Sequence, residues 1–407
     1  MQSIATQDHS TPASRHFLST NTVRSNARAL LERARRGESA WLAVHDAKLH
    51  EVAALVAQVT RLNYPTLAIP YHSRWRHFEA GGIDRKVWLD AALARHMPTA
   101  NATNAGTALT ARMRIDLTVV SVLLDAGAGP QWRYAEAQTG QSLGRSEGLG
   151  VASLHAFMAG LFSSDPAMPL QADARGLQAL TVDKLAHAFQ VTASNPLVGL
   201  EGRCALLQRL GKALDGRPGG MFDALTANDE PVQAHAILSW LLTHLGPVWL
   251  AGNTMDGTPV GDCWPCPAAP GGWMPFHKLS QWLTYSLLEP FEWAGVQVTG
   301  LEQLTGLPEY RNGGLMLDAG VLQLKDPAWA AQAWQPADQL IVEWRALTVA
   351  LLDELAPLVR AELGLTEAQM PLACVLEGGT WAAGRAMAQR LRAGAPPLDI
   401  VSDGTVF

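Results

Sequence analysis

Apolar residues recur at spacings of three and four along most of this chain, and this helical period limits its possible folds more than any other feature. Between residues 46 and 62, for example, leucines and valines form one continuous stripe. The same period predicts helices over 25–36, 46–62, 84–96, 108–124, 148–162, 181–190, 201–214, 231–245, 276–294, 337–363 and 366–392. Strand candidates are short, at 66–69, 297–299 and 398–401. We therefore expect a mainly α fold with a few short strands.

The composition indicates a large buried core. Of the 407 residues 48% are hydrophobic and 17% are charged, and the charged fraction lies below the roughly 25% of an average soluble protein. No unit of 20–50 residues repeats, which disfavours a solenoid. We expect a mobile N-terminal arm over 1–20 and a single large helical catalytic domain over 21–407, with a subdivision near 165–180 as the alternative.

Charge and cysteine content exclude several classes of partner. The net charge of −6 comes without a basic block, so we expect no nucleic-acid binding. The uncharged stretch 231–255 has an apolar run too short for a bilayer, and the first residues lack the apolar run of a signal peptide, so a cytoplasmic protein without membrane contact is expected. Cys263 and Cys266 form a lone CxxC pattern, which is weak evidence for zinc. We expect no metal and no cofactor.

The segment 274–295 is apolar on most sides but carries one polar line. Lys278, Gln281, Tyr285 and Glu289 fall at helical spacings of three and four. A polar line on a buried helix needs partners or a ligand, and His277 with Lys278 in the first turn would hold an anion with help from free backbone N–H groups. The alternative is a solvated face with paired charges.

A Pro- and Gly-framed turn at 304–314 presents Glu309, Tyr310 and Arg311 in succession. One interpretation is a helix start at which Glu309 complements the helix dipole. The other is a fixed carboxylate beside a guanidinium, placed for chemistry.

Three further segments carry candidate polar groups. The segment 71–78 contains His72, Arg74, Arg76 and His77 around a tryptophan. This pattern suits a phosphate monoester or, equally, an arginine that stacks on the tryptophan and caps carbonyl groups. Asp125 ends an apolar helix, as a terminal polar residue or as a carboxylate held by a rigid element. Glu377 precedes two glycines that permit a kink or a close approach of two backbones.

Four stretches, FHKLSQWLTYSLLEP, LTGLPEYRNGGLMLDAGVL, LEGGTWAAGR and SDGTVF, resemble the uracil catabolism protein family of bacteria and fungi, long a domain of unknown function. The resemblance extends from about residue 20 to the C-terminus. It implies a step in a pathway in which uracil becomes its nucleotide, the ring is opened by a cyclohydrolase-like enzyme, and urea is released later.

A second resemblance, to the queuosine salvage protein family, rests on three short stretches. That family consists of mainly α-helical N-glycosylases that hydrolyse a nucleoside 5′-phosphate. Its Lys-Arg-Ala-Gln motif is matched by Lys278 and Gln281 alone, and its acidic-Tyr-Arg motif by 309–311, with Glu309 in place of the usual Asp. An Asp and aromatic segment of that family corresponds to Asp125 and Trp132.

Together these features suggest an N-ribosyl hydrolase that cleaves ribosylurea 5′-phosphate or a related ring-opened uridine nucleotide. Such cleavage passes through an oxocarbenium-like state, which needs negative charge at the anomeric carbon. We expect Glu309 and Asp125 to be catalytic. The expected substrate-binding residues are His277, Lys278, Gln281, Arg311, Tyr310, Arg74, His72, Trp132, Trp282, Glu377 and Trp381.

The expected partner is thus a small phosphorylated ribose derivative, and the sequence leaves the oligomeric state open. Two alternatives remain: a transferase or lyase on the same nucleotide, and a non-catalytic nucleotide-binding or assembly partner of uracil breakdown.

Overall fold

A computed structural model describes residues 12–96, 104–228, 230–248 and 253–401. Within these ranges the prediction of a mainly α fold is confirmed. The helices are α1 (Pro12–Phe17), α2 (Thr20–Arg35), α3 (Leu49–Asn63), α4 (Arg74–His77), α5 (Lys86–His96), α6 (Asn104–Leu123), α7 (Arg145–Met158), α8 (Ala174–Gln178), α9 (Val182–Ala188), α10 (Leu200–Ala213), α11 (Gly220–Thr226), α12 (Ala234–Leu245), α13 (Lys278–Glu292), α14 (Tyr310–Asp318), α15 (Gln339–Leu363), α16 (Leu372–Val375) and α17 (Trp381–Arg392).

Strands form two-stranded ribbons between helices. The pairs are β1 (Leu42–Val44) with β10 (Leu322–Leu324), β2 (Tyr134–Glu136) with β3 (Gln141–Leu143), β4 (Val232–Gln233) with β9 (Val298–Thr299), β5 (Thr254–Met255) with β6 (Thr258–Pro259), β7 (Cys263–Pro265) with β8 (Trp273–Pro275), and β11 (Ala333–Trp334) with β12 (Asp399–Ile400). The predicted strands at 297–299 and 398–401 are confirmed in β9 and β12.

Two local predictions need correction. The strand expected at 66–69 is absent, and Leu67 has a φ of 57°, which a strand cannot accommodate. The helix expected over 366–392 begins only at Leu372 and is interrupted by a π-helical segment, η8 (Leu376–Thr380). A Cβ atom on Gly379 would lie 2.5 Å from the Val56 carbonyl oxygen, so the glycine lets η8 approach the backbone of α3.

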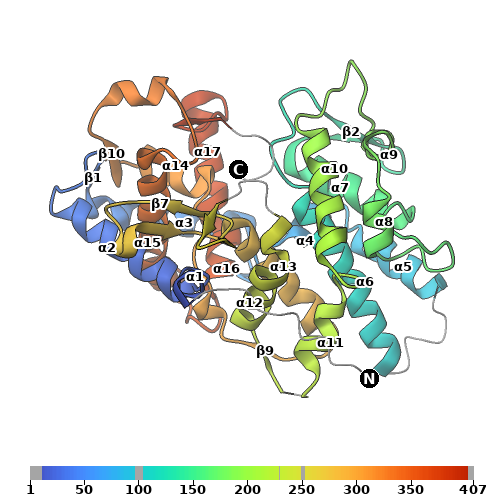
Figure 1. Cartoon of the computed structure of the whole chain (residues 1–407). Helices are drawn as coiled ribbons and strands as arrows, with labels where there is room; N and C mark the ends of the chain where they lie inside the picture. The colour runs from blue at the N-terminus through green and yellow to red at the C-terminus, as the bar shows by residue number, and fades with distance from the viewer. Residues whose placement is uncertain (1–11, 97–103, 229, 249–252, 402–407) are drawn as a thin grey trace.

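The helices form two groups on either side of α13 (Figure 1). In one group α15 packs against α2 and α3, and α14 packs against α17. In the other, α10 packs against α8 and α9, while α6 contacts α7 and α11. Helix α13 contacts α6, α12 and α4, and the first group contains segments from both ends of the described chain.

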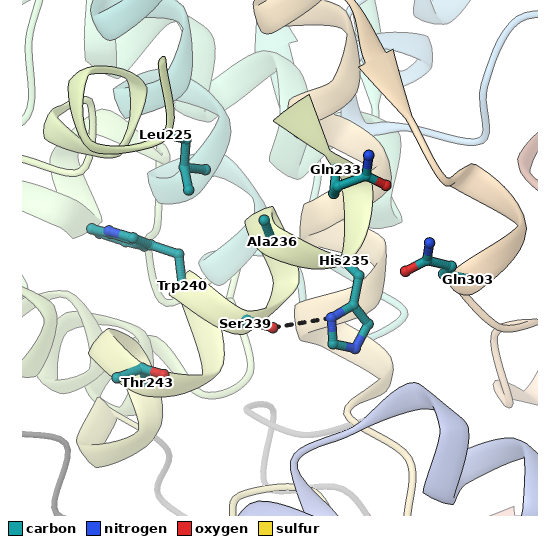
Figure 2. A pocket seen from close by; sticks show the side chains of 8 residues that line it. All are labelled: Leu225, Gln233, His235, Ala236, Ser239, Trp240, Thr243 and Gln303. Carbon is teal, nitrogen blue, oxygen red and sulfur yellow. Dashed lines mark hydrogen bonds between the residues drawn. The ribbon is translucent and has the colours of Figure 1, made fainter. Parts of the chain in front are cut away.

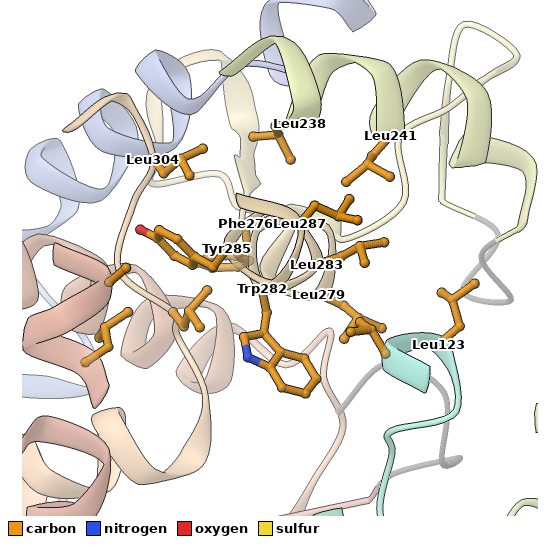
Figure 3. Packing of buried hydrophobic residues seen from close by; sticks show 14 of the residues in the cluster. Leu123, Leu238, Leu241, Phe276, Leu279, Trp282, Leu283, Tyr285, Leu287 and Leu304 are labelled. Atoms are coloured by element: carbon orange, nitrogen blue, oxygen red, sulfur yellow. The ribbon is translucent and has the colours of Figure 1, made fainter. Parts of the chain in front are cut away.

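Helix α13 is the centre of the hydrophobic core. Figure 3 shows apolar side chains on every side of it, from α12, from α6 and from the loop before α14. All its residues from Leu279 to Phe291 are buried, including the polar ones. A buried helix of this kind holds the residues at its N-terminus in a fixed position, which matters for the site described below.

The chain's beginning packs onto this body from residue 12 onward. Of the segment expected as an arm, residues 12–17 form α1, and Phe17 is buried beside Val260 and Cys263. Residues 1–11 lie outside the described residues. Among the helices that the structure describes, none combines the length and apolar character needed to cross a membrane.

Candidate active site

The Glu309 carboxylate caps the N-terminus of α14. It accepts hydrogen bonds from the backbone N–H groups of Arg311 at 2.7 Å and Asn312 at 2.6 Å, and only 9% of the residue is exposed. Burial raises the pKa of this carboxyl group, while the two N–H donors and the nearby Lys278 charge oppose the rise. The helix-start interpretation is therefore confirmed, and the same two hydrogen bonds hold the carboxylate in a fixed position.

Lys278 faces this carboxylate from the first position of α13. Burial lowers the pKa of its ammonium group, and the nearby Glu309 and Asp125 carboxylates counteract that effect. In the described part of the chain, however, no carboxylate oxygen lies within 4.0 Å of the Lys278 ammonium group, the distance limit for an ion pair. The cation is thus close to two anions and is paired with neither.

Asp125, which follows the end of α6, contributes the second carboxylate. Its Oδ2 atom lies 3.2 Å from Nη1 of Arg74, a residue with no exposed surface. The Arg74 Nε–H group donates to the Ser121 hydroxyl at 2.6 Å. Arg74 Nη2 and Asp125 Oδ1 are buried, and neither has a hydrogen-bond partner within the described ranges.

His72 and Glu377 form a third polar unit. The His72 Nδ1 atom lies 2.7 Å from Glu377 Oε2, and the Tyr64 hydroxyl donates to Glu377 Oε1 at 2.9 Å. Burial raises the pKa of Glu377, but the hydrogen bonds from His72 and Tyr64 and the positive charge of His72 outweigh it, so the pKa lies below its ordinary value. Glu377 lies in η8, so the π-helical segment carries part of the site.

Aromatic rings link these polar units. The Arg74 guanidinium lies 5.8 Å from the ring centroid of Trp282, and the His72 ring lies 6.5 Å from Trp282 and 6.2 Å from Trp381. The Arg311 guanidinium lies 4.7 Å from the ring of Tyr310, which is 37% exposed. Flat aromatic surfaces next to charged groups are typical of pockets for polar ligands with planar or cyclic parts.

Unsatisfied polar atoms are concentrated here. Buried side-chain atoms in native proteins nearly always have hydrogen-bond partners, so each exception needs an explanation. Five of the buried atoms without a partner in the described chain belong to residues of this cluster: Arg74 Nη2, His77 Nδ1, Asp125 Oδ1, Trp282 Nε1 and Arg311 Nε. A bound polar molecule would satisfy them.

Most of the residues singled out in the sequence meet in this cluster. The structure brings together Glu309, Asp125, Lys278, Arg311, Tyr310, Arg74, His72, Trp282, Glu377 and Trp381. These residues come from both helix groups and from α13 between them, so the cluster forms only in the folded chain.

Three expected substrate-binding residues are engaged elsewhere. The Nε2 atom of His277 lies 2.7 Å from the Phe17 carbonyl oxygen, and Trp132 is fully buried and donates to the Phe189 carbonyl at 2.9 Å. Gln281 donates to the Phe276 carbonyl at 2.9 Å and to the Thr305 hydroxyl at 2.6 Å, and it accepts from the Thr305 N–H. Two residues of the polar line on α13, Gln281 and Tyr285, thus fix the loop that leads to Glu309.

The anion at the N-terminus of α13 is a carboxylate of the chain itself. Asp262 accepts from the Lys278 N–H at 3.0 Å and makes two contacts with the Arg345 guanidinium, at 2.7 and 2.8 Å. The Arg345 charge and these hydrogen bonds overcome burial and lower the Asp262 pKa to about 2. The Lys278 N–H group expected to help hold a ligand anion is therefore occupied.

The cluster contains two groups that were not among the expected site residues. His77 was noted in the segment 71–78 because histidines and arginines surround Trp75 there. Its ring centroid is 5.6 Å from that of Trp282, and burial and the Arg74 charge lower its pKa to about 3, so it is neutral. Tyr64, which bonds to Glu377, ends the α3 pattern and was missed because it had no distinctive neighbours.

A hollow of about 520 Å³ lies elsewhere, over α12 (Figure 2). It is lined by Leu225, Gln233, His235, Ala236, Ser239, Trp240, Thr243 and Gln303, none of which belongs to the cluster. Several of its polar groups already have partners, since His235 is bonded to Ser239 and Gln233 donates to the Thr299 hydroxyl. Among the described residues, no three His, Cys, Asp or Glu side chains are arranged to hold a metal ion.

Comparison with known proteins places the chain in a family. It is 42% identical over 403 residues to "Protein urg3" of Schizosaccharomyces pombe, an alignment that covers 96% of this chain and 98% of the relative. It is 35% identical over 446 aligned positions to "Uracil catabolism protein 4" of Lachancea kluyveri, again with 96% and 98% covered. A model of the family described as "Protein of unknown function (DUF1688)" matches residues 16–407, and the chain belongs to this family.

Proposed function

We propose that the protein is an N-ribosyl hydrolase that cleaves the N-glycosidic bond of ribosylurea 5′-phosphate or of a related ring-opened uridine nucleotide. The observation that carries the proposal is the convergence of unpartnered buried polar atoms, and of the unpaired Lys278 cation, around the Glu309 carboxylate. Burial alone would not favour such groups, whereas an anionic, hydroxyl-rich ligand would satisfy both their charge and their hydrogen bonds.

In glycosidic bond cleavage the Glu309 carboxylate would stabilise positive charge on the sugar. Breaking a C–N glycosidic bond develops positive charge on the ribose ring, which a fixed carboxylate stabilises while it activates water or attacks the anomeric carbon. Glu309 is held for this by two backbone N–H groups. Asp125, ion-paired with Arg74, offers an unpartnered acceptor oxygen for ribose hydroxyls.

The phosphate group needs cations that the protein does not already use. Lys278 has no ion-pair partner in the described chain, and Arg311 Nε and Arg74 Nη2 have no acceptor there. Guanidinium and ammonium donors suit phosphate oxygens. We assign these three residues to the phosphate, with the Trp282 and Trp381 rings as walls of the site.

The name of one relative supports the choice of a substrate derived from uracil. One relative is named a uracil catabolism protein, and we propose a role in uracil catabolism for this chain as well. A ring-opened uridine nucleotide retains the ribose 5′-phosphate, which the cationic groups would bind. The group attached to its C1′ atom is a urea-like nitrogen, which would be the leaving group.

The direct test is an assay of purified protein with ribosylurea 5′-phosphate that follows both urea and ribose 5-phosphate. We expect both products in equal amounts, and a rate roughly 10²- to 10⁴-fold lower in Glu309→Gln. Glu302→Gln, at an exposed glutamate in the short helix before the site, is the control and keeps the wild-type rate.

Three results would overturn the proposal: no product from the wild type, a full rate in Glu309→Gln, or urea released without an equal amount of ribose 5-phosphate. The last of these would identify a transferase or lyase. Ligand binding without turnover would identify a nucleotide-binding partner instead of an enzyme.

A further inference from the structure

We infer that His72, oriented by Glu377, is the general acid that protonates the leaving nitrogen. This inference rests on the proposed glycosidic cleavage. The sequence indicated Asp125 as the second catalytic residue and placed Glu377 and His72 among the substrate-binding residues. Three features of the structure point to the imidazole instead.

The first feature is the occupation of both carboxylates. Glu377 uses one oxygen for His72 at 2.7 Å and the other for Tyr64 at 2.9 Å. Asp125 is ion-paired with the fully buried Arg74 guanidinium at 3.2 Å. A carboxylate whose partner is a guanidinium acts as a hydrogen-bond acceptor and not as a proton donor.

The second feature is the fixed orientation of the His72 ring. Its Nδ1 atom faces Glu377, its backbone N–H donates to the Ala373 carbonyl at 3.0 Å, and its ring lies among Trp282 and Trp381. The Glu377 carboxylate at Nδ1 fixes the plane of the ring and leaves Nε2 on the opposite side of the ring from Glu377. Within the described ranges Nε2 has no hydrogen-bond partner.

The third feature is the position of the ring relative to the proposed base. His72 lies close enough to Glu309 for its charge to lower the pKa of that carboxyl group. The other histidine nearby, His77, is held neutral by burial and by Arg74, and therefore cannot supply a proton at neutral pH. His72 thus contacts Glu377 directly and lies near the Glu309 carboxylate.

The proposed step conserves atoms and charge. The C1′–N bond breaks and its electron pair moves to the leaving nitrogen, which takes the proton from His72 Nε2 and departs as neutral urea. A water oxygen adds to C1′, and the proton it loses passes to the Glu309 carboxylate. His72 and Glu309 then exchange protons with solvent, and the net reaction consumes one water.

Two substrates that differ in their need for an acid test the inference. Ribosylurea 5′-phosphate needs protonation of its leaving group, whereas 4-nitrophenyl riboside 5-phosphate releases a stable phenolate. We expect His72→Asn and Glu377→Gln to lower kcat roughly 10²- to 10⁴-fold with the urea substrate and less than about 5-fold with the nitrophenyl substrate. Glu309→Gln should lower both.

A histidine far from the cluster provides the matched control. His235→Asn, in the hollow over α12, should leave both rates unchanged, and thermal unfolding shows which variants are folded. If the wild type turns over only ribosylurea 5′-phosphate, the test is instead the rescue of His72→Gly by added imidazole. We expect imidazole to raise the rate of this variant at least roughly 10-fold.

Equal losses with both substrates in His72→Asn, or no rescue by imidazole, would overturn this inference while leaving the glycosidase proposal intact. A wild type that hydrolyses neither substrate would instead overturn the proposed function. A full rate of His72→Asn with the urea substrate would also exclude the acid role.

Discussion

At the scale of single residues, the site depends on a charge pair that is close but not in contact. Burial raises the pKa of Glu309 and lowers that of Lys278, and each charge partly offsets the effect of burial on the other. Because no ion pair joins them in the described structure, both keep hydrogen-bonding capacity for a ligand. In the proposed function Lys278 contacts the phosphate directly and acts on Glu309 through its charge.

Lys278→Met tests this double role. Removal of the positive charge raises the pKa of Glu309 further, and a base is active only when it is ionised. The acid limb of kcat/KM therefore moves to higher pH, and kcat/KM at its optimum falls roughly 10- to 100-fold through the lost phosphate contact. Steady-state rates across the pH range measure both effects. Lys278→Arg should keep the acid limb in place; an acid limb that stays fixed or moves to lower pH in Lys278→Met contradicts the charge coupling.

Single residues also show what the sequence can predict of the site. Glu309 and Lys278 were identifiable because polar groups stand out in apolar or Gly- and Pro-rich surroundings, and Arg74 because arginines and histidines are concentrated around a tryptophan. Gln281 and His277 stand out equally, yet their side chains bond to Thr305 and to the Phe17 carbonyl. Sequence spacing gives the face of a helix but not which neighbour covers that face.

At the scale of elements, the helical spacing of apolar residues predicted most of the fold. Close contacts between two backbones could not be predicted in this way. The pattern over 366–392 suggested one helix because two glycines in the middle do not alter its apolar period. The contact between η8 and α3 needs Gly379, since a Cβ there would meet both the Val56 carbonyl and the Thr60 hydroxyl. The bulge of η8 in turn places Glu377 beside His72.

Gly379→Ala should therefore destabilise the protein. The added methyl group would lie 2.5 Å from Val56 O and 2.7 Å from Thr60 Oγ1, and overpacking of this kind costs about 1–3 kcal/mol. Gly220→Ala is the matched control, because nothing lies within 4 Å of the new atom in α11, and we expect no loss of stability or a small gain. Urea denaturation measures both changes in the free energy of unfolding. An unchanged stability in Gly379→Ala would mean that the approach of η8 to α3 is not tight.

At the scale of the whole molecule, the site is assembled from distant parts of the chain. Arg74, Asp125, Lys278, Glu309 and Glu377 lie on five segments that belong to both helix groups and to α13 between them. The apolar surroundings of α13 fix where these segments meet. Such convergence depends on tertiary packing, which is why the sequence could name the candidates but not their neighbours.

A site built in this way exists only in the folded protein, so its ligand should stabilise the whole molecule. Ribose 5-phosphate, which carries the sugar and the phosphate of the proposed product, should raise Tm by an amount that grows with concentration, equivalent to about 2.7 kcal/mol at 100 times Kd. Ribose alone lacks the anion and should give a much smaller shift, and Lys278→Met should weaken the effect of ribose 5-phosphate while His235→Asn keeps it. Thermal unfolding at increasing ligand concentration measures these shifts. Equal shifts from ribose 5-phosphate in Lys278→Met and in the wild type would show that the sugar phosphate binds away from the Glu309 cluster.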